Sequence, residues 1–275
     1  MNFEYFSKNG KILPIEQAVI PLSNIEYTYG FGVYENIRIS NGIIYFLKDH
    51  TDRLFESAKI IGITHTFNEE FIKKSISDLI KNYRSETFNL KILLIGAPTK
   101  EKAILNILCQ NPLFPDKKLY RDGAEFITYS YERPFPHAKT LNMLESYLAY
   151  RKAKQKNAYD ALLINHDRLI FEGTRTNFFC IKDKVIYTPF EKNILLGVMR
   201  KATLKVALGN NYKIVEKDIK LDDIKSYDGA FVTSTSSKIM PIKFIDGNIL
   251  NIPDSLINLM KLLNNFLKNC RGKME

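Results

Sequence analysis

The spacing of apolar residues alternates along this chain between the pattern of strands and the pattern of helices. Two short apolar runs within 34–47 flank Asn41-Gly42, the dipeptide most typical of a two-residue β-hairpin. Residues 49–61 and 71–83 then place apolar side chains at helical spacing, which predicts two amphipathic helices. Strands followed by helices favour an α+β fold, in which helices are layered on a sheet.

The alternation resumes in the second half of the chain, after a segment that is typical of a linker. Residues 112–123 combine two prolines with a cluster of charges. At 275 residues the chain also exceeds the ~100–200 typical of one domain. We therefore expect a smaller N-terminal α/β domain at 1–115 and a larger C-terminal domain at 116–275. Strands are expected at 90–96, 103–109, 125–131, 161–165, 168–171, 178–181, 185–187, 230–232 and 242–245, and further helices at 141–158, 198–207 and 256–267.

The expected helix at 141–158 carries apolar residues at helical spacing. Leu141, Leu144, Leu148 and Ala149 fall on one face, and lysines and arginines fall on the other. We expect the leucine face to be buried.

Composition and cysteine usage exclude several classes of protein. Hydrophobic residues make up 45% and charged residues 25% of the chain, with no apolar run near the ~18 residues of a membrane span. The N-terminus lacks a basic region followed by an apolar one, so we expect a cytoplasmic protein with no membrane partner. Cys109, Cys180 and Cys270 are odd in number and far apart. This spacing argues against disulfides and a zinc site, so we expect reduced thiols and no metal.

The chain carries a formal net charge of +10. Its lysines are dispersed and do not gather beside aromatic residues, so we interpret the charge as a solvated basic surface and expect no nucleic-acid partner. No glycine-rich dinucleotide loop follows a strand, which disfavours the nicotinamide-dependent folds.

One lysine stands where an expected strand gives way to an expected helix. Lys139 lies in the segment 137–142, ahead of the apolar-faced helix. A buried lysine is costly unless it loses its charge or is covalently engaged, so this position is a candidate nucleophile. A lysine that lays its stem along the surface is the more frequent explanation for a single lysine. The motifs around Lys139 must distinguish between these two explanations.

Further motifs accompany Lys139 in a fixed order along nearly the whole chain. They are Tyr29-Gly30, Gly32-Val33-Tyr34-Glu35, His50-Thr51-Asp52-Arg53-Leu54, Leu141-Asn142-Met143-Leu144, Tyr159-Asp160-Ala161, Phe171-Glu172-Gly173-Thr174, Gly197-Val198-Met199-Arg200 and Thr233-Ser234-Thr235-Ser236. With these motifs the chain resembles the class IV aminotransferases, which are fold-type IV pyridoxal-phosphate enzymes. The resemblance implies pyridoxal 5'-phosphate as cofactor. It also implies two α/β domains, with the catalytic lysine and most of the cofactor site in the larger one.

The resemblance assigns the central roles to two residues. Lys139 is implied to be the catalytic lysine, which binds the cofactor covalently and moves a proton once it is released. Glu172 is implied to face the pyridine nitrogen, where a carboxylate keeps the ring protonated. Asn177 lies beside it and is also implied to bind the cofactor. A surface glutamate in a hairpin is the alternative explanation for Glu172.

The cofactor phosphate requires several converging donors. Arg53 offers a guanidinium, the turn before Val198 and Met199 opens an expected helix, and Thr235 and Ser236 lie in a hydroxyl-rich loop. Arg53 could instead pair with an acidic neighbour on a helix surface. The loop could be an ordinary polar turn. The family order of these elements favours phosphate binding.

The residues that contact substrate are less clearly specified. Branched-chain aminotransferases usually have small residues at the positions of Asn36 and Arg175, and a tyrosine at the position of Leu144. The arginine that D-amino-acid aminotransferases have near Ile95 is absent, and Lys91 or Arg175 could replace it as the carboxylate anchor. A strand-edge role for Lys91 and a surface ion pair for Arg175 are equally plausible. The implied substrate-binding residues are Tyr29, Tyr34, Arg38, Lys91 and Arg175.

The leading hypothesis is an aminotransferase that moves an amino group between an amino acid, of branched-chain or D-amino-acid type, and a 2-oxo acid. An aminodeoxychorismate lyase is the alternative, because such lyases share the context of Leu141 to Glu145. A catalytically inactive basic binding module with the same fold is the second alternative. The resemblance also implies a homodimer, because a neighbouring subunit completes the family's pocket.

Overall fold

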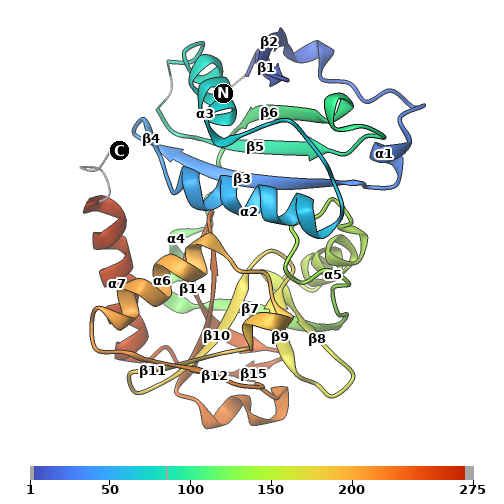
Figure 1. The fold of residues 1–275 in the computed structure, drawn as a ribbon. Coiled ribbons are helices and arrows are strands. Elements are labelled where there is room, and N and C mark those ends of the chain that lie inside the picture. Colours follow the sequence, from blue (N-terminus) through green and yellow to red (C-terminus); the bar gives the residue numbers. More distant parts are fainter. Residues whose placement is uncertain (1–2, 85, 270–275) are drawn as a thin grey trace. The chain divides into compact units, whose positions relative to one another are not determined.

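The computed structural model describes residues 3–84 and 86–269, whose strands form two sheets. The chain divides into two compact units, which are Met1–Leu113 with His137–Asn142, and Phe114–Pro136 with Met143–Glu275 (Figure 1). The sequence analysis places Lys139 in the larger domain, whereas residues 137–142 belong here to the N-terminal unit, because their backbone pairs with a strand of that unit. Cys270 lies outside the described residues.

The N-terminal unit is an antiparallel sheet with helices. Its strands are β1 Tyr5–Lys8, β2 Lys11–Pro14, β3 Gly32–Ser40, β4 Ile43–Ile44, β5 Phe88–Ile95 and β6 Ile104–Gln110, and its helices are α1 Ile25–Thr28, α2 Leu47–Ile60 and α3 Glu69–Ile80. The strand order is β2-β1-β6-β5-β3-β4. Apolar residues of β3 and β5 form one core with the buried faces of α2 and α3, including Leu54 and Ile76. This burial is the main source of the unit's stability.

The hairpin between β3 and β4 confirms the turn expected at Asn41-Gly42. Both residues have positive φ, 53° and 74°, as a tight hairpin turn requires. The second strand is shorter than expected, since β4 ends at Ile44 and α2 begins at Leu47. Along β3, Val33 and Ile37 alternate with residues of the opposite face.

The C-terminal unit is built on the larger sheet. Its strands are β7 Ala124–Ser130, β8 Asp160–Ile164, β9 Ile170–Gly173, β10 Asn177–Lys182, β11 Val185–Thr188, β12 Lys213–Glu216, β13 Gly229–Ser234, β14 Lys238–Ile245 and β15 Asn248–Ile249. The order is β12-β11-β10-β13-β14-β7-β8-β9, and β15 pairs with β14. Because β9 also pairs with β10, the sheet closes on itself at that seam.

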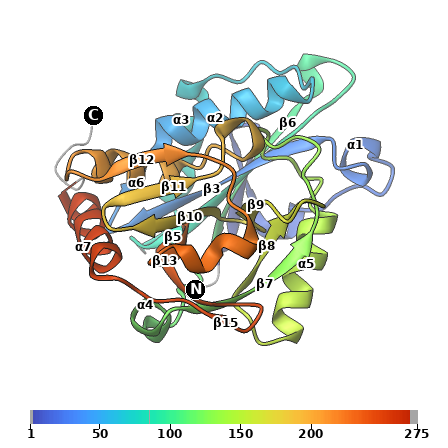
Figure 2. The same cartoon turned by 90° about the horizontal axis from the view of Figure 1, so that it is seen from below.

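Four α-helices are described in the C-terminal unit. They are α4 Lys117–Asp122, α5 Leu144–Gln155, α6 Val198–Leu208 and α7 Asp254–Asn269. In this unit α5 packs on β8 (Figure 2). Helix α6 packs on β13 and on α7, and α4 packs on β14. The expected linker at 112–123 therefore contains a short helix. The units change at residue 113, and the division into two folding domains stays a prediction.

The buried face of α5 differs from the expected leucine face. The helix begins at Leu144 rather than at 141, and Leu144 is 64% exposed. Ala149 and Ala153 form the buried face instead, in a core cluster with residues of β7 and β8. Small side chains let the helix backbone approach the sheet closely, and this burial decides the orientation. The prediction that Leu144 and Leu148 point inward was wrong.

Cys109 and Cys180 are free and buried. Burial raises the pKa of the Cys109 thiol to about 12, so this thiol stays protonated and is a poor nucleophile. The prediction of reduced thiols is confirmed for these two cysteines. Among the helices of the described residues, none is long and apolar enough to cross a membrane.

Candidate active site

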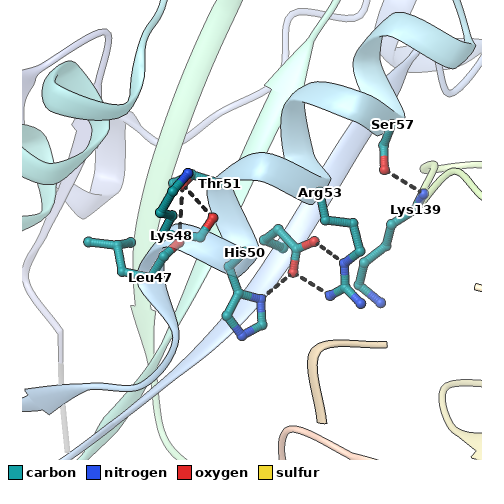
Figure 3. A network of polar contacts seen from close by, with 8 residues as sticks. Leu47, Lys48, His50, Thr51, Arg53, Ser57 and Lys139 are labelled. Atoms are coloured by element: carbon teal, nitrogen blue, oxygen red, sulfur yellow. Dashed lines mark hydrogen bonds and ion pairs between the residues drawn. The ribbon is translucent and has the colours of Figure 1, made fainter. Parts of the chain in front are cut away.

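The segment that carries Lys139 is fixed through its backbone. The carbonyl of Lys139 accepts a hydrogen bond from the N–H of Tyr34 at 2.9 Å. The N–H of Lys139 donates to Oγ of Ser57, a buried residue of α2, at 3.0 Å (Figure 3). Thr140 forms an antiparallel bridge with Val33 of β3. The peptide of Lys139 is therefore held by both β3 and α2.

The side chain of Lys139 lies near two other expected site residues. Its Nζ is 4.5 Å from the centroid of the Tyr34 ring, which is a cation–π distance. The side chains of Lys139 and Arg53 point in the same direction in Figure 3. The N-terminal unit thus brings together Lys139, Tyr34 and Arg53, which come from three separate motifs.

A buried carboxylate orients Arg53. The side chain of Glu35 is 0% exposed, and its two oxygens accept from Nε and Nη2 of Arg53, each at 2.7 Å. Glu35 Oε2 also lies 2.7 Å from Nδ1 of His50, which carries the hydrogen because a carboxylate only accepts. Burial raises the pKa of Glu35, but Arg53 and His50 outweigh it and lower that pKa to about 2. The guanidinium is therefore held in one orientation by an ionised partner.

Replacing Glu35 by Gln should destabilise the protein. An amide removes the fully buried negative charge that faces Arg53, whose side chain is 13% exposed, and breaking a buried ion pair costs about 3–5 kcal/mol. The free energy of unfolding from urea denaturation at pH 7 measures the loss. Glu70→Gln, on the exposed side of α3, is the matched control and should change stability by less than about 0.5 kcal/mol. Equal stabilities of the two variants would contradict the role of Glu35.

The same pair predicts a pH dependence. Because the pKa of Glu35 is lowered from 4.5 to about 2 on folding, its ionised form adds stability above pH 4.5 that is lost as the pH falls toward 2. We expect the wild type, but not Glu35→Gln, to lose this stability over that window.

Two expected substrate residues lie on the sheet face that carries Tyr34. In the pairing of β3 with β5, Arg38 lies opposite Asn89 and Lys91 lies opposite Asn36. Since side chains alternate along strands, Arg38 and Lys91 share the face of Tyr34. Tyr29 follows α1 and is 80% exposed. In the described part of the chain, no side-chain interaction joins Tyr29 to this face.

In the C-terminal unit, Glu172 and Asn177 face each other across the seam that closes the sheet. They are partners in the register of β9 and β10. Glu172 Oε2 accepts from the N–H of Leu195 at 3.2 Å, and Asn177 Nδ2 donates to the carbonyl of Leu195 at 2.6 Å. A Cβ at Gly197 would collide with Oδ1 of Asn177, so the backbone approaches this seam as only glycine allows.

The other oxygen of Glu172 binds an arginine that the sequence analysis did not select. Arg133 Nη1 donates to Glu172 Oε1 at 2.9 Å, and its Nη2 donates to the carbonyl of Phe135 at 3.3 Å. The side chains of Arg133 and Glu172 are 16% and 6% exposed.

Two groups of potential phosphate donors lie next to the seam. The first intrahelical bond of α6 joins Lys201 N–H to Gly197, so the N–H groups of Val198 and Met199 precede the helical ladder. Such N–H groups and the helix dipole favour an anion. Thr233, the register partner of Asn177, leads into the second group.

The second group is the turn 235–237 between β13 and β14, which contains Thr235 and Ser236. Ser234 Oγ lies 3.2 Å from Oγ of Ser236 and 2.7 Å from Oγ of Ser237. The C-terminal unit thus brings together Glu172, Asn177, the start of α6 and this turn.

Arg175 is exposed on the surface of the same unit as Glu172. Its guanidinium carbon is 4.3 Å from the centroid of the Tyr150 ring on α5, which is a cation–π distance. Burial raises the pKa of the neighbouring Tyr159, which hydrogen-bonds Ser237 of the hydroxyl-rich turn. Arg175 therefore stands near the turn through Tyr159.

Four residues that orient the candidate site were not predicted from the sequence, namely Glu35, His50, Ser57 and Arg133. Glu35 occupies a strand position of the same parity as buried Val33, and a charge at such a position is a signal that could have been used. His50 lies one helical turn before Arg53 in α2. Ser57 and Arg133 act through long-range contacts, for which the sequence holds no local signal.

Comparisons with known proteins show which family this chain belongs to. A sequence model of the family described as "Amino-transferase class IV" matches residues 32–245. A D-alanine aminotransferase from Bacillus licheniformis is 32% identical over 251 residues, which cover 88% of each chain. A putative branched-chain-amino-acid aminotransferase from Methanocaldococcus jannaschii is 32% identical over 255 residues, again 88% of each chain.

The fold has counterparts among solved structures. A branched-chain aminotransferase from the thermophilic archaeon Thermoproteus uzoniensis, solved with norvaline, superposes with a TM-score of 0.85 at 25% identity. The superposition covers 98% of this chain and 96% of the other.

Proposed function

Because this chain belongs to the class IV aminotransferase family, we propose that it is a pyridoxal 5'-phosphate-dependent aminotransferase that acts on an amino acid and a 2-oxo acid. The observation that carries this proposal is the placement of Lys139, whose peptide is fixed by Tyr34 and Ser57 and whose amine is free of ion pairs in the described residues. The relatives named for D-alanine and branched-chain substrates support it.

The donor sets of both units fit the cofactor. Buried Nε2 of His50, in the N-terminal unit, has no hydrogen-bond partner among the described residues. Thr233 Oγ1, in the C-terminal unit, is likewise buried and unpaired in that part of the chain. A buried polar atom without a partner is costly, so these atoms point to a polar ligand. Arg53 and the start of α6 suit a phosphate, and Glu172 suits a protonated ring nitrogen.

When bound, the cofactor supplies a protonated ring that accepts the electron pair left at the substrate's α-carbon. Lys139 would hold it covalently through Nζ, and Glu172 would keep a proton at the ring nitrogen. The Nζ of Lys139 would also take the proton from the substrate's α-carbon and later return one. Within the N-terminal unit, Arg53, which Glu35 orients, would bind phosphate. Within the C-terminal unit, Val198, Met199, Thr235 and Ser236 would do so.

Mixing the purified protein with pyridoxal 5'-phosphate tests the proposal directly. The chain has no Trp, so an absorption band beyond the tyrosine region reports a bound chromophore. We expect such a band, its loss on adding an amino-acid donor, and formation of the corresponding 2-oxo acid. A protein that stays colourless would support the binding module, and release of pyruvate from aminodeoxychorismate would support the lyase.

Arg175→Ala should raise the KM for amino-acid and 2-oxo-acid substrates at least tenfold and leave cofactor affinity nearly unchanged. We propose that the guanidinium anchors the substrate carboxylate, and a charge-assisted pair contributes about 1.5–3 kcal/mol. Steady-state kinetics and cofactor titration measure the two effects. Arg121→Ala, at an exposed arginine of α4, is the control. Loss of cofactor in Arg175→Ala would place the anchor elsewhere.

We propose that the protein forms a homodimer. On α5, Leu144 is 64% and Tyr147 is 57% exposed. Large apolar side chains that are exposed on one face of a helix are typical of an interface with another subunit. Sedimentation at micromolar concentration should therefore give twice the mass of the chain, and a fully active monomer would contradict this proposal.

A further inference from the structure

We propose that Arg133 is the positioning residue of Glu172, whose carboxylate it pairs with and holds in one orientation before any cofactor arrives. This inference rests on the proposed function, in which Glu172 faces the ring nitrogen of pyridoxal 5'-phosphate. Arg133 itself belongs to the loop between β7 and the lysine segment, 39 positions before Glu172.

Two donors fix the Glu172 carboxylate from two sides. Arg133 Nη1 binds Oε1 at 2.9 Å, and the N–H of Leu195 binds Oε2 at 3.2 Å. With both oxygens engaged, the carboxylate plane cannot rotate freely. Each oxygen retains a second lone-pair site, so a further N–H donor can still bind without displacing either partner.

Burial gives this arrangement its electrostatic importance. The Glu172 side chain is 6% exposed, and a carboxylate removed from water is unfavourable unless a cation accompanies it. Arginine suits this role because its guanidinium is charged at every relevant pH and is planar. Its second donor, Nη2, is directed at the carbonyl of Phe135 at 3.3 Å, which holds the guanidinium in place.

The consequence is a preorganised negative charge. A group that is already ionised and oriented needs no rearrangement when the reaction develops charge nearby, and such preorganisation is a major source of catalysis. Arg133 would not contact the substrate. Its loss should therefore lower kcat and change KM little.

The test compares Arg133→Met with the wild type and with a matched control. The variant removes the charge and keeps most of the apolar stem. We expect kcat to fall at least tenfold, KM to change less than threefold, and the absorption band of bound pyridoxal 5'-phosphate to shift. Arg121→Met removes an arginine of the same unit from an exposed pair with Asp122. This control should leave kcat, KM and the absorption band unchanged.

A double-variant cycle shows whether Arg133 acts through Glu172. In a Glu172→Gln background, Arg133→Met should have less than a threefold effect on kcat and no effect on the band, because the carboxylate that it positions is gone. A further tenfold loss in that background would show that Arg133 acts on something else and would overturn the proposal. This comparison remains decisive even if Arg133→Met alone fails to fold.

Thermal unfolding of the cofactor-free protein provides a readout that needs no activity. Arg133→Met should lower the unfolding midpoint much more in the Glu172 background than in the Glu172→Gln background. Equal shifts in the two backgrounds would contradict the ion pair. A wild type that binds no pyridoxal 5'-phosphate would overturn the proposed function, whereas an active wild type with an equally active Arg133→Met would overturn this inference alone.

Discussion

Lys139→Ala should reduce transamination at least ~10³-fold, the upper part of the ~10²–10⁴-fold range of a single general acid–base group, because the covalent link is lost as well. The fold should be retained, since the contacts that fix residue 139 are made by its backbone with Tyr34 and Ser57. The single-turnover rate with an amino-acid donor and the circular dichroism spectrum measure the two outcomes.

The control for this variant is Lys73→Ala, an exposed lysine of α3, which should keep the wild-type rate. A small primary amine added to Lys139→Ala should restore part of the rate, because it supplies a proton acceptor where Nζ is missing. A rate within tenfold of the wild type, without added amine, would remove Lys139 from the catalytic role.

Glu172→Gln should retain the cofactor and lose about 10²–10³-fold in single-turnover rate, as expected when one preorganised electrostatic partner is removed. An amide accepts the same hydrogen bond from Leu195 but carries no charge to keep the ring nitrogen protonated. Cofactor titration followed by rapid mixing with an amino acid separates binding from rate.

Glu125→Gln, an exposed position of β7, is the matched control and should behave as the wild type. An unchanged rate in Glu172→Gln would contradict the assignment, and loss of cofactor without loss of rate in the loaded fraction would make the residue a binding group only.

Local chemistry in the sequence is sufficient to predict much of the fold. The Asn41-Gly42 turn, the strands expected at 178–181 and 185–187, and helix α6 are confirmed close to their expected bounds, because turn residues and apolar period act over a few residues. The fold-type IV aminotransferase fold and the family are also confirmed by the comparisons. The order of short motifs identified that family when no single motif could.

Long-range contacts explain what the sequence did not predict. The leucines of α5 have a regular helical spacing, yet Ala149 faces the sheet, because close packing outweighs the larger apolar surface. The pairing of Arg133 with Glu172 depends on where the loop after β7 meets strand β9 in space. The roles of Arg53, Glu172 and the substrate residues stay predictions, which the variants above test.

Residues 137–142 belong to the N-terminal unit but are translated after residues 114–136 of the other unit, which has a consequence for biosynthesis. Ser57 and Lys139 are hydrogen-bonded although they lie 82 positions apart in the chain. While the ribosome has delivered only the first 113 residues, the N–H of Tyr34 and Oγ of Ser57 lack the hydrogen bonds that they form with Lys139 in the folded unit. The N-terminal unit is therefore completed only once residues 137–142 emerge, so the last piece of this unit to be translated is the one that brings its reactive amine.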